Sequence, residues 1–223
     1  MLPPSPAPAS CHVIACATVF EEMQPFLPPG VTHEILEYGL HNRPPNLRAA
    51  LQQRLDAVQA GTVLLGYGLC SLAVVGLVSP TARLVIPRVD DCIALFLGSR
   101  TAYREQISRE PGTYYLTKGW VDEADTPFKE YDRLVAKYGA ETADDVIHMM
   151  FQHYTRLCFI NTGHGDLAPY HAYGREMAAR FKLRFETVDG SPALVQELAQ
   201  GPWDDEFVVA PPGRALAYTD FTR

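Results

Sequence analysis

The chain has 223 residues, of which 47% are hydrophobic and 20% charged, and its formal net charge is −7. These values are typical of a soluble globular protein. The negative charge and the absence of a basic stripe argue against a nucleic-acid-binding protein. The apolar run at residues 69–78 is shorter than the roughly 20 residues that a membrane span requires, so we expect no membrane association.

The amino terminus and the cysteines point to a cytoplasmic protein. Residues 1–10 contain four prolines and predict a short disordered tail. They lack the basic start and the apolar stretch of a signal peptide. The five cysteines are odd in number and irregularly spaced, which indicates free thiols in a reducing compartment rather than a disulfide framework.

Strand and helix patterns alternate along the first hundred residues. The predicted strands cover residues 12–16, 31–37, 62–66 and 83–87. The predicted helices cover about 19–27, 46–60, 70–78 and 91–98, with Glu21 and Glu22 in the first turn of the first helix. This order predicts a parallel sheet with right-handed crossovers.

The alternation is interrupted at about residues 99–154, where we expect a helical cap inserted into the fold. Its predicted parts are helices at about 100–109, 126–138 and 140–154 and an aromatic turn region at 111–120. Alternation then resumes with strands at 156–161, 183–188 and 206–210 and helices at 169–181 and 191–200. The sequence therefore predicts one α/β domain over residues 11–223, a three-layer doubly wound and mostly parallel sheet with a cap.

Four residues with metal-binding side chains follow the first four predicted strands: Cys16, His41, Cys70 and Cys92. Loops after parallel strands converge on one crevice, so these side chains are expected to form one site. A helix N-terminus lowers the pKa of a nearby thiol, which suits a ligand or a nucleophile. Cysteine and histidine together suit zinc, and three cysteines can hold an iron–sulfur cluster. The alternative is that the cysteines are buried structural residues.

Several short sequence segments resemble those of a known family, the domain of unknown function numbered 1638. They are Ala15-Cys16, Leu40-His41-Asn42, Gly66-Tyr67-Gly68-Leu69-Cys70, Ile86-Pro87-Arg88-Val89-Asp90-Asp91-Cys92-Ile93 and Pro111-Gly112-Thr113-Tyr114-Tyr115. The resemblance covers most of the chain after the proline-rich tail. It implies functional positions at Cys16, Glu22, His41, Cys70 and Cys92. This chain has Val89-Asp90 where the family pattern has Ala-His, which removes one potential ligand.

The resemblance also bears on partners, because some relatives occur beside corrinoid-dependent methylamine methyltransferases. It therefore implies one-carbon chemistry and a corrinoid methyltransferase system as a partner, together with a small-molecule substrate or cofactor.

Other residues are weaker candidates for the same site. Glu22 could contact a metal, and His164, in the loop after residues 156–161, could act as an acid, a base or a ligand. Tyr67 and Gly68 lie in Gly66-Tyr67-Gly68-Leu69-Cys70-Ser71, which is close to a dinucleotide fingerprint, although the third glycine is replaced by Ser71. The neighbouring aromatic residues Tyr114, Tyr115 and Trp120 could line a pocket over the cysteines, with Tyr115 as a cofactor contact, or form a small satellite core.

These candidates lead to three functional hypotheses. The first is a metal-dependent enzyme with zinc, or alternatively an iron–sulfur cluster, that performs group transfer or hydrolysis. The second is an accessory protein that binds an iron–sulfur or corrinoid-like cofactor without catalysis of its own. The third is a metal-free enzyme with Cys70 or Cys92 as nucleophile and His164 as its partner.

Overall fold

The chain forms two compact units, each with its own parallel-dominated sheet. The computed structural model describes residues 10–70, 72–123, 126–163 and 165–222. Residues 101–190 belong to the second unit, and the described residues on either side of that range belong to the first. The first unit is therefore assembled from two separate stretches of the chain.

The first unit is built on a sheet with the strand order β2-β1-β3-β4-β8. Its strands are β1 (Cys11–Cys16), β2 (Thr32–Leu36), β3 (Thr62–Gly66), β4 (Arg83–Pro87) and β8 (Phe207–Ala210). The pairs among the first four strands are parallel, and β8 joins β4 as an antiparallel edge. Every residue of β3 is buried, as expected for a central strand covered on both faces.

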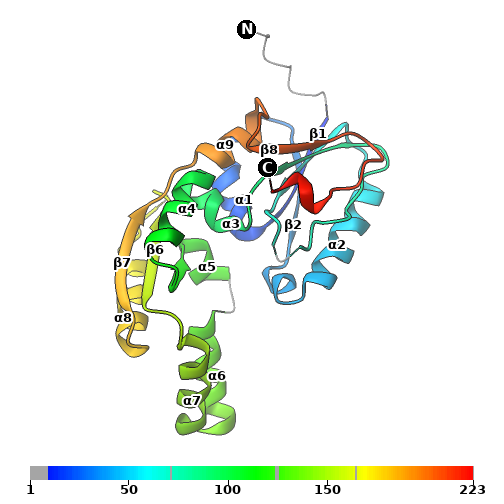
Figure 1. The fold of residues 1–223 in the computed structure, drawn as a ribbon. Coiled ribbons are helices and arrows are strands. Elements are labelled where there is room, and N and C mark those ends of the chain that lie inside the picture. Colours follow the sequence, from blue (N-terminus) through cyan, green and yellow to red (C-terminus); the bar gives the residue numbers. More distant parts are fainter. Residues whose placement is uncertain (1–9, 71, 124–125, 164, 223) are drawn as a thin grey trace. The chain divides into compact units, whose positions relative to one another are not determined.

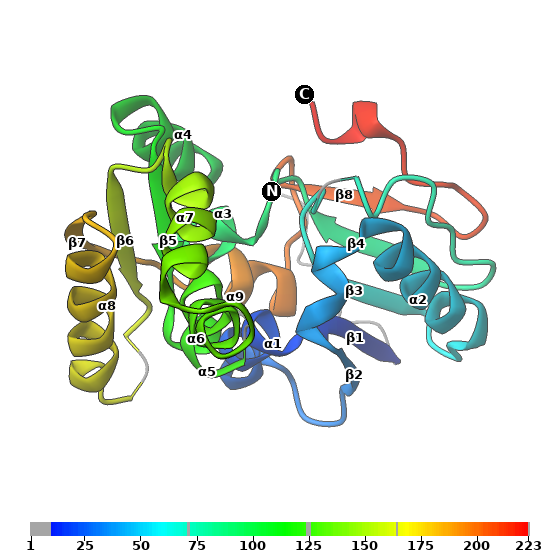
Figure 2. The ribbon, with the colours of Figure 1, turned by 90° about the horizontal axis from the view of Figure 1, so that it is seen from below.

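Helices cover both faces of this sheet (Figures 1 and 2). On one face α1 (Ala17–Met23) and α3 (Cys92–Leu97) pack with α9 (Ala193–Gln200). On the other lies α2 (Pro44–Ala57), which buries Leu47, Leu51 and Leu55 at the spacing of one helix face. Short 3₁₀ turns complete the unit: η1 (Gln24–Phe26), η2 (Tyr38–Asn42) and η3 (Tyr218–Asp220).

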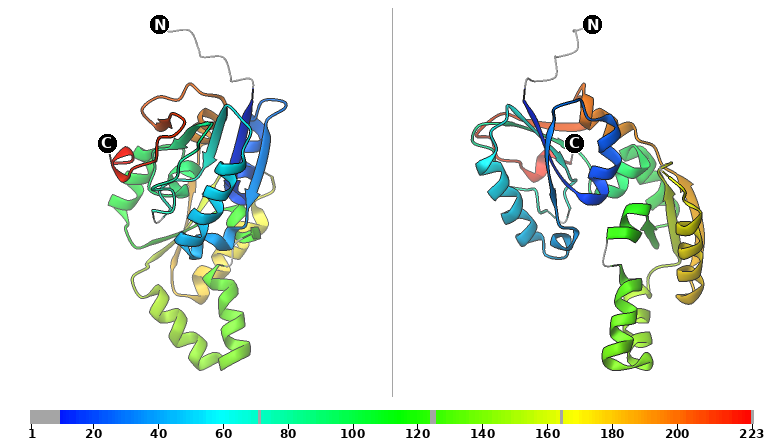
Figure 3. Two further views of the ribbon diagram at one scale, coloured as in Figure 1. Left: turned by 90° about the vertical axis from the view of Figure 1, so that its right-hand side faces the viewer. Right: turned by 180° about the vertical axis from the view of Figure 1, so that it is seen from behind.

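The second unit is built on a parallel sheet with the order β5-β6-β7. These strands are β5 (Thr113–Leu116), β6 (Arg156–Asn161) and β7 (Arg184–Asp189). Its helices are α4 (Arg100–Arg109), α5 (Lys118–Glu123), α6 (Pro127–Tyr138), α7 (Ala140–Phe151) and α8 (Ala168–Arg180). The helix α8 packs on β6 and β7, and α6 and α7 run side by side as a hairpin (Figure 3).

An aromatic cluster ties the helical hairpin to the rest of the second unit. The rings of Phe128 and Phe151, from α6 and α7, are stacked with centroids 5.5 Å apart, and both stack on Phe181 after α8. Tyr114 on β5 meets Phe128 and Phe151 edge-on. Such pairs stabilise beyond their buried area, so the satellite core expected around Tyr114 is present.

The mixed α/β class with mostly parallel strands is confirmed, but the strands divide differently from the single sheet that the sequence predicts. Residues 156–161 and 183–188 do form strands, yet these pair with β5 in a second sheet. The strand β5 itself occupies part of the region expected to be an aromatic turn. Alternating patterns predict strands but not the sheet to which each strand belongs. The helical cap expected at 99–154 falls mostly within a larger unit over residues 101–190, which has its own sheet.

Two local predictions in the first unit are wrong. Residues 70–78 form no α-helix in their described part, because Cys70 and Leu72 have left-handed φ values of 45° and 67°, which a right-handed helix excludes. The first helix begins at Ala17 rather than about residue 19, so Glu21 and Glu22 lie beyond its first turn. No helix among the described residues is long and apolar enough to cross a membrane.

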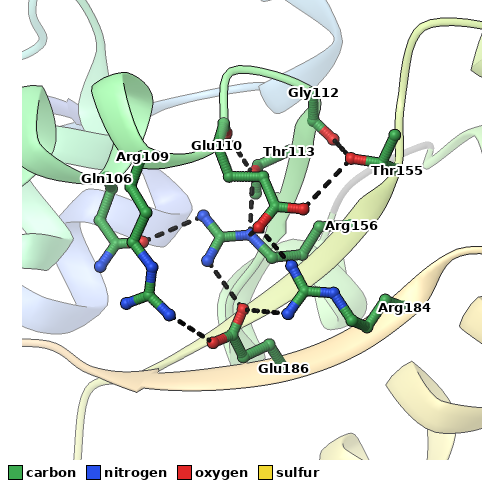
Figure 4. A network of polar contacts seen from close by, with 9 residues as sticks. All are labelled: Gln106, Arg109, Glu110, Gly112, Thr113, Thr155, Arg156, Arg184 and Glu186. Carbon is green, nitrogen blue, oxygen red and sulfur yellow. Dashed lines mark hydrogen bonds and ion pairs between the residues drawn. The ribbon is translucent and has the colours of Figure 1, made fainter.

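A buried arginine joins the three strands of the second unit at their amino-terminal ends (Figure 4). The side chain of Arg156 has no exposed surface. It donates to Thr113 Oγ1 at 2.8 Å, to Glu186 Oε2 at 2.9 Å and to Gln106 Oε1 at 3.0 Å. Arg184 also binds Glu186, and it binds Glu110 as well. Hydrogen bonding to Arg156 lowers the pKa of Glu186.

Arg156→Met is expected to lower the free energy of unfolding by about 3 kcal/mol, because it strips charged and polar partners from a buried network. The control Arg133→Met removes an exposed pair with Glu130 and should cost less than about 0.5 kcal/mol. Denaturant titration measures both changes.

The cost of Arg156→Met should depend on pH. The pKa of Glu186 in the folded protein lies below the reference value of 4.5, so the stabilisation of the fold by the ionised Glu186 is fully present above pH 4.5. It is lost as the pH falls through the lowered pKa. The difference in free energy of unfolding between wild type and Arg156→Met should therefore become smaller below about pH 4.5. A difference that grows on acidification would contradict this explanation.

Candidate functional site

The candidate site lies at the carboxyl ends of β1 and β3, where the strand order reverses. From β1 the chain passes to β2 on one side and then to β3 on the other. Open α/β sheets bind ligands in the crevice at such a switch point. Cys16 ends β1, and Tyr67 directly follows Gly66, the residue that pairs with Ala15. Cys16 and Tyr67 therefore leave two neighbouring strands side by side.

The loops after β3 and β4 are joined by backbone hydrogen bonds. Leu69 N donates to Val89 O at 2.9 Å, and Cys70 N donates to Asp90 O at 3.1 Å. This approach requires Gly68, because a Cβ there would lie 2.8 Å from Val89 O. The two loops therefore bring Cys70 beside the segment that carries Cys92.

Local backbone structure fixes the two loop cysteines. Cys70 has a φ of 45°, which a non-glycine residue adopts only when its surroundings hold it there. Cys92 is the first residue of α3, and Asp91 caps that helix by accepting a hydrogen bond from Ile93 N at 2.9 Å. Both residues are thus held by the connection between the loops and by the cap.

The thiols of Cys16, Cys70 and Cys92 act on one another electrostatically, which places them in one cluster that we call the thiol pocket. Burial raises the pKa of each thiol, that of Cys70 to about 12. Cys16 further raises the pKa of Cys70, and both raise that of Cys92. Asp91 raises the pKa of Cys70 and Cys92 as well.

The expectation of lowered thiol pKa values is therefore wrong. Desolvation of a thiolate and repulsion among acidic groups outweigh the helix termini. In the metal-free protein the three thiols are neutral at pH 7.

Two further side chains belong to the thiol pocket. Tyr67 is buried, and the thiols of Cys16, Cys70 and Cys92 each raise its pKa in addition to the larger effect of burial. His41, from the turn after β2, stacks on the ring of Tyr67 with centroids 5.8 Å apart. The structure thus brings together the three predicted cysteines, Tyr67 and Gly68, with His41 against the tyrosine ring.

The sequence did not single out Thr18, whose Oγ1 lies 3.2 Å from Cys16 Sγ and shares a hydrogen bond with it. The only available signal is its position two residues after Cys16 in the turn that opens α1.

The other two cysteines lie in a different electrostatic setting. Cys11 begins β1, and burial raises the pKa of its thiol while the charge of Arg83 offsets part of the increase. Cys158 lies within β6 of the second unit, where Arg156 lowers a pKa that burial raises to about 11. For Cys70 and Cys92 the side chains that raise the pKa in addition to burial are neighbouring thiols and Asp91.

The remaining predicted residues are not placed in the thiol pocket. Glu22 is buried on α1, and its contact with a metal stays a prediction. Tyr115 is buried on β5 of the second unit, as Trp120 is on α5. His164 lies outside the described residues, as does Ser71.

The dinucleotide hypothesis loses its main structural support. That fingerprint needs a helix after the glycine loop to receive the pyrophosphate, and the described residues after Cys70 form turns instead. Gly66 and Gly68 are explained by close packing against Ala15 and Val89.

The thiol pocket has suitable donors for a metal but no ready coordination shell. Within the described ranges, no three His, Cys, Asp or Glu side chains are arranged to hold a metal ion. The donors therefore suit a metal by residue type, and binding would require their side chains to change position.

Comparison with known proteins gives a family without an assigned activity. The family model for a protein of unknown function, DUF1638, matches residues 35–199. The chain belongs to this family. No curated protein and no solved structure matches it. The matched range includes His41, Cys70 and Cys92, and the resemblance recognised in the sequence is confirmed.

Alkylation should show that the pocket thiols are unreactive in the metal-free protein. Raising the pKa of Cys70 from 9.0 to about 12 lowers its thiolate fraction about 1000-fold at pH 7. The greater nucleophilicity of a more basic thiolate recovers part of this, which leaves Cys70 roughly 30–60-fold slower than a free cysteine. Mass spectrometry after iodoacetamide treatment, with unfolded protein as the reference, measures this rate. Half-maximal reactivity below pH 8 at any pocket cysteine would contradict it.

Gly68→Ala should separate the two loops, since the new Cβ meets the backbone of Val89 and Asp91 at 2.8–3.0 Å. We expect a loss of about 1–3 kcal/mol in the free energy of unfolding. Gly39→Ala is the control, because a Cβ at Gly39 has no neighbour within 4 Å. Equal free energies of unfolding for Gly68→Ala and Gly39→Ala would contradict the close approach of Gly68 to Val89.

Proposed function

We propose that the protein binds a thiophilic metal ion in the thiol pocket, with zinc as the first candidate, and uses it for group transfer such as one-carbon transfer. The observation that carries this proposal is the convergence of three thiols. Cys16, Cys70 and Cys92 follow three strands of one sheet, the loops of Cys70 and Cys92 are joined by backbone hydrogen bonds, and the three thiols act on one another electrostatically. The thiols are neutral without a metal, and coordination would replace the proton of each with a bond to the ion.

The residues that would hold the ion are Cys16, Cys70 and Cys92, with His41 as the candidate fourth ligand. Thiolate and imidazole are the usual zinc donors. A zinc ion would supply Lewis acidity for group transfer or hydrolysis. The protein's own part is to present the thiols from loops that Gly68 and the Asp91 cap hold in place, and to exclude water from them.

One feature distinguishes this proposal from the metal-free alternative, while the cluster alternative uses the same three cysteines. A metal-free nucleophile needs a thiolate at neutral pH, and burial opposes one at all three positions. The presence of three cysteines also suits an iron–sulfur cluster, in which case the protein would be an accessory binder of that or a corrinoid-like cofactor. All five cysteines are free thiols, which fits the reducing cytoplasm that we propose as its location.

Elemental analysis of anaerobically purified protein tests the proposal. Wild type should hold about one zinc per chain, whereas Cys70→Ser and Cys92→Ser should lose it, because a serine hydroxyl stays protonated near neutral pH. The control Cys11→Ser should keep its metal. Colour and iron in the wild type would favour the cluster, and no metal in any form would refute the proposal.

Metal uptake should also release protons and strengthen as the pH rises. Each coordinating thiol starts neutral and must lose its proton to bind. Zinc titration in weakly buffered solution measures the release, and uptake without proton release would mean that the pocket thiols are not the ligands.

A further inference from the structure

The helical hairpin of α6 and α7 carries more apolar surface than its own unit covers. On α7 one apolar stripe is buried, formed by Ala143, Ile147 and Phe151. A second stripe at helical spacing stays accessible, because Val146 is only partly buried and Met149 and Met150 are 67% and 47% exposed. On α6, Leu134 is partly exposed and Tyr138 is 54% exposed.

The hairpin packs on α8 through its other side. The guanidinium carbon of Arg180, on α8, lies 4.1 Å from the ring centre of Tyr131 on α6. Arg180 also binds Asp132, and the hydroxyl of Tyr131 donates to Asp144 of α7 at 2.8 Å. Asp132 and Asp144 therefore mark the side of each helix that is turned toward α8.

The accessible apolar residues lie away from that side. Each residue advances a helix by about 100°, so Leu134 and Tyr138 lie about 160° and 120° around α6 from Asp132. On α7 the three accessible residues lie about 120–160° from Asp144. They form one surface, which we call the hairpin face: Leu134, Tyr138, Val146, Met149 and Met150.

The two helices that form the hairpin face differ in charge. The helix α7 has three acidic residues and neither lysine nor arginine: Glu141, Asp144 and Asp145. The helix α6 has three basic residues at intervals of four: Lys129, Arg133 and Lys137. The two acidic residues of α6, Glu130 and Asp132, both form ion pairs, with Arg133 and Arg180. The hairpin therefore has a basic helix beside an acidic one.

A second copy of the hairpin complements this surface in both shape and charge. A two-fold axis parallel to the helices lays α6 of each copy on α7 of the other, with neighbouring helices antiparallel as in a four-helix bundle. This arrangement sets basic helices on acidic ones. A two-fold axis across the helices would instead oppose α7 to α7, with like charges facing one another.

The size of the hairpin face indicates a weak dimer. Twelve residues span about 18 Å, and packed helices lie about 8–10 Å apart, so the face measures about 18 by 20 Å. A contact of this size is at the low end for specific interfaces, where complexes are reversible.

We propose that two copies of this chain associate through the hairpin face, so that α6 and α7 of each copy together form an antiparallel four-helix bundle. The surface belongs to the second unit, whereas the thiol pocket belongs to the first. The inference therefore does not depend on metal binding, and it is tested with metal-free protein.

Sedimentation velocity of the full chain in reducing buffer, from low to high micromolar concentration, tests the proposal. Wild type should dimerise reversibly. Met150→Lys should weaken the dimer by at least about 10-fold, because a charge then enters an apolar contact in both copies. The control Ile107→Lys changes an apolar residue on α4 that is 39% exposed and should leave the dimer unchanged. Circular dichroism should show wild-type melting temperatures for both variants.

Charge reversal tests which helices face each other. Lys137→Glu and Asp145→Lys should each weaken the dimer by about 3–10-fold at low salt, since each places like charges on α6 and on the α7 of the other copy. An equimolar mixture of the two variants should associate about as tightly as wild type. In the mixed dimer, both contacts between α6 and α7 again join opposite charges.

Three results would overturn the inference. A chain that stays monomeric at high micromolar concentration would leave the hairpin face to a different protein. A dimer that tolerates Met150→Lys would use another surface. A mixture that associates no more tightly than its two components alone would exclude the pairing of α6 with the α7 of the other copy.

Discussion

The connection between the loops after β3 and β4 is the constraint on which the thiol pocket depends. Two backbone hydrogen bonds and the bare Cα of Gly68 allow these loops to touch. Without that contact, Cys70 and Cys92 would follow separate strands with nothing to hold them in register. The left-handed backbone of Cys70 is a consequence, because the chain must turn sharply after the contact. Packing between the two loops thus positions the thiol side chains, and residues 72–76 form turns instead of a helix.

Much of the first unit was predictable because its signals are local. The apolar run over 62–66 and the spacing of Leu47, Leu51 and Leu55 need no knowledge of tertiary structure. The convergence of the loops that carry Cys16, Cys70 and Cys92 was predictable from topology, since parallel strands deliver their following loops to one edge. The helix predicted at 70–78 was wrong because it rested on apolar composition. Apolar composition indicates that a segment is buried, and burial alone does not distinguish a helix from a series of turns.

The sequence did not reveal the protonation state of the thiols or how the strands divide between two sheets. Helix position alone favours a thiolate at Cys92, yet burial raises the pKa of this thiol, and the thiols of Cys70 and Cys16 from other loops raise it further. Likewise, β6 and β7 carry the same pattern as strands of the first sheet, and only their pairing with β5 reveals a second one. Both failures concern contacts between segments distant in the chain, which no local pattern encodes.

The discontinuity of the first unit has a consequence for how the chain emerges from a ribosome. Residues 101–190 are contiguous and carry their own sheet, aromatic cluster and arginine network, so their partners are all available once that stretch has been made. The first unit begins earlier but finishes later, because α9 and the edge strand β8 come from residues beyond 190. Until α9 and β8 have been synthesised, β4 has no strand on its open side and the apolar faces of α1 and α3 lack their native contacts. The unit that carries the thiol pocket is therefore the last to complete its fold.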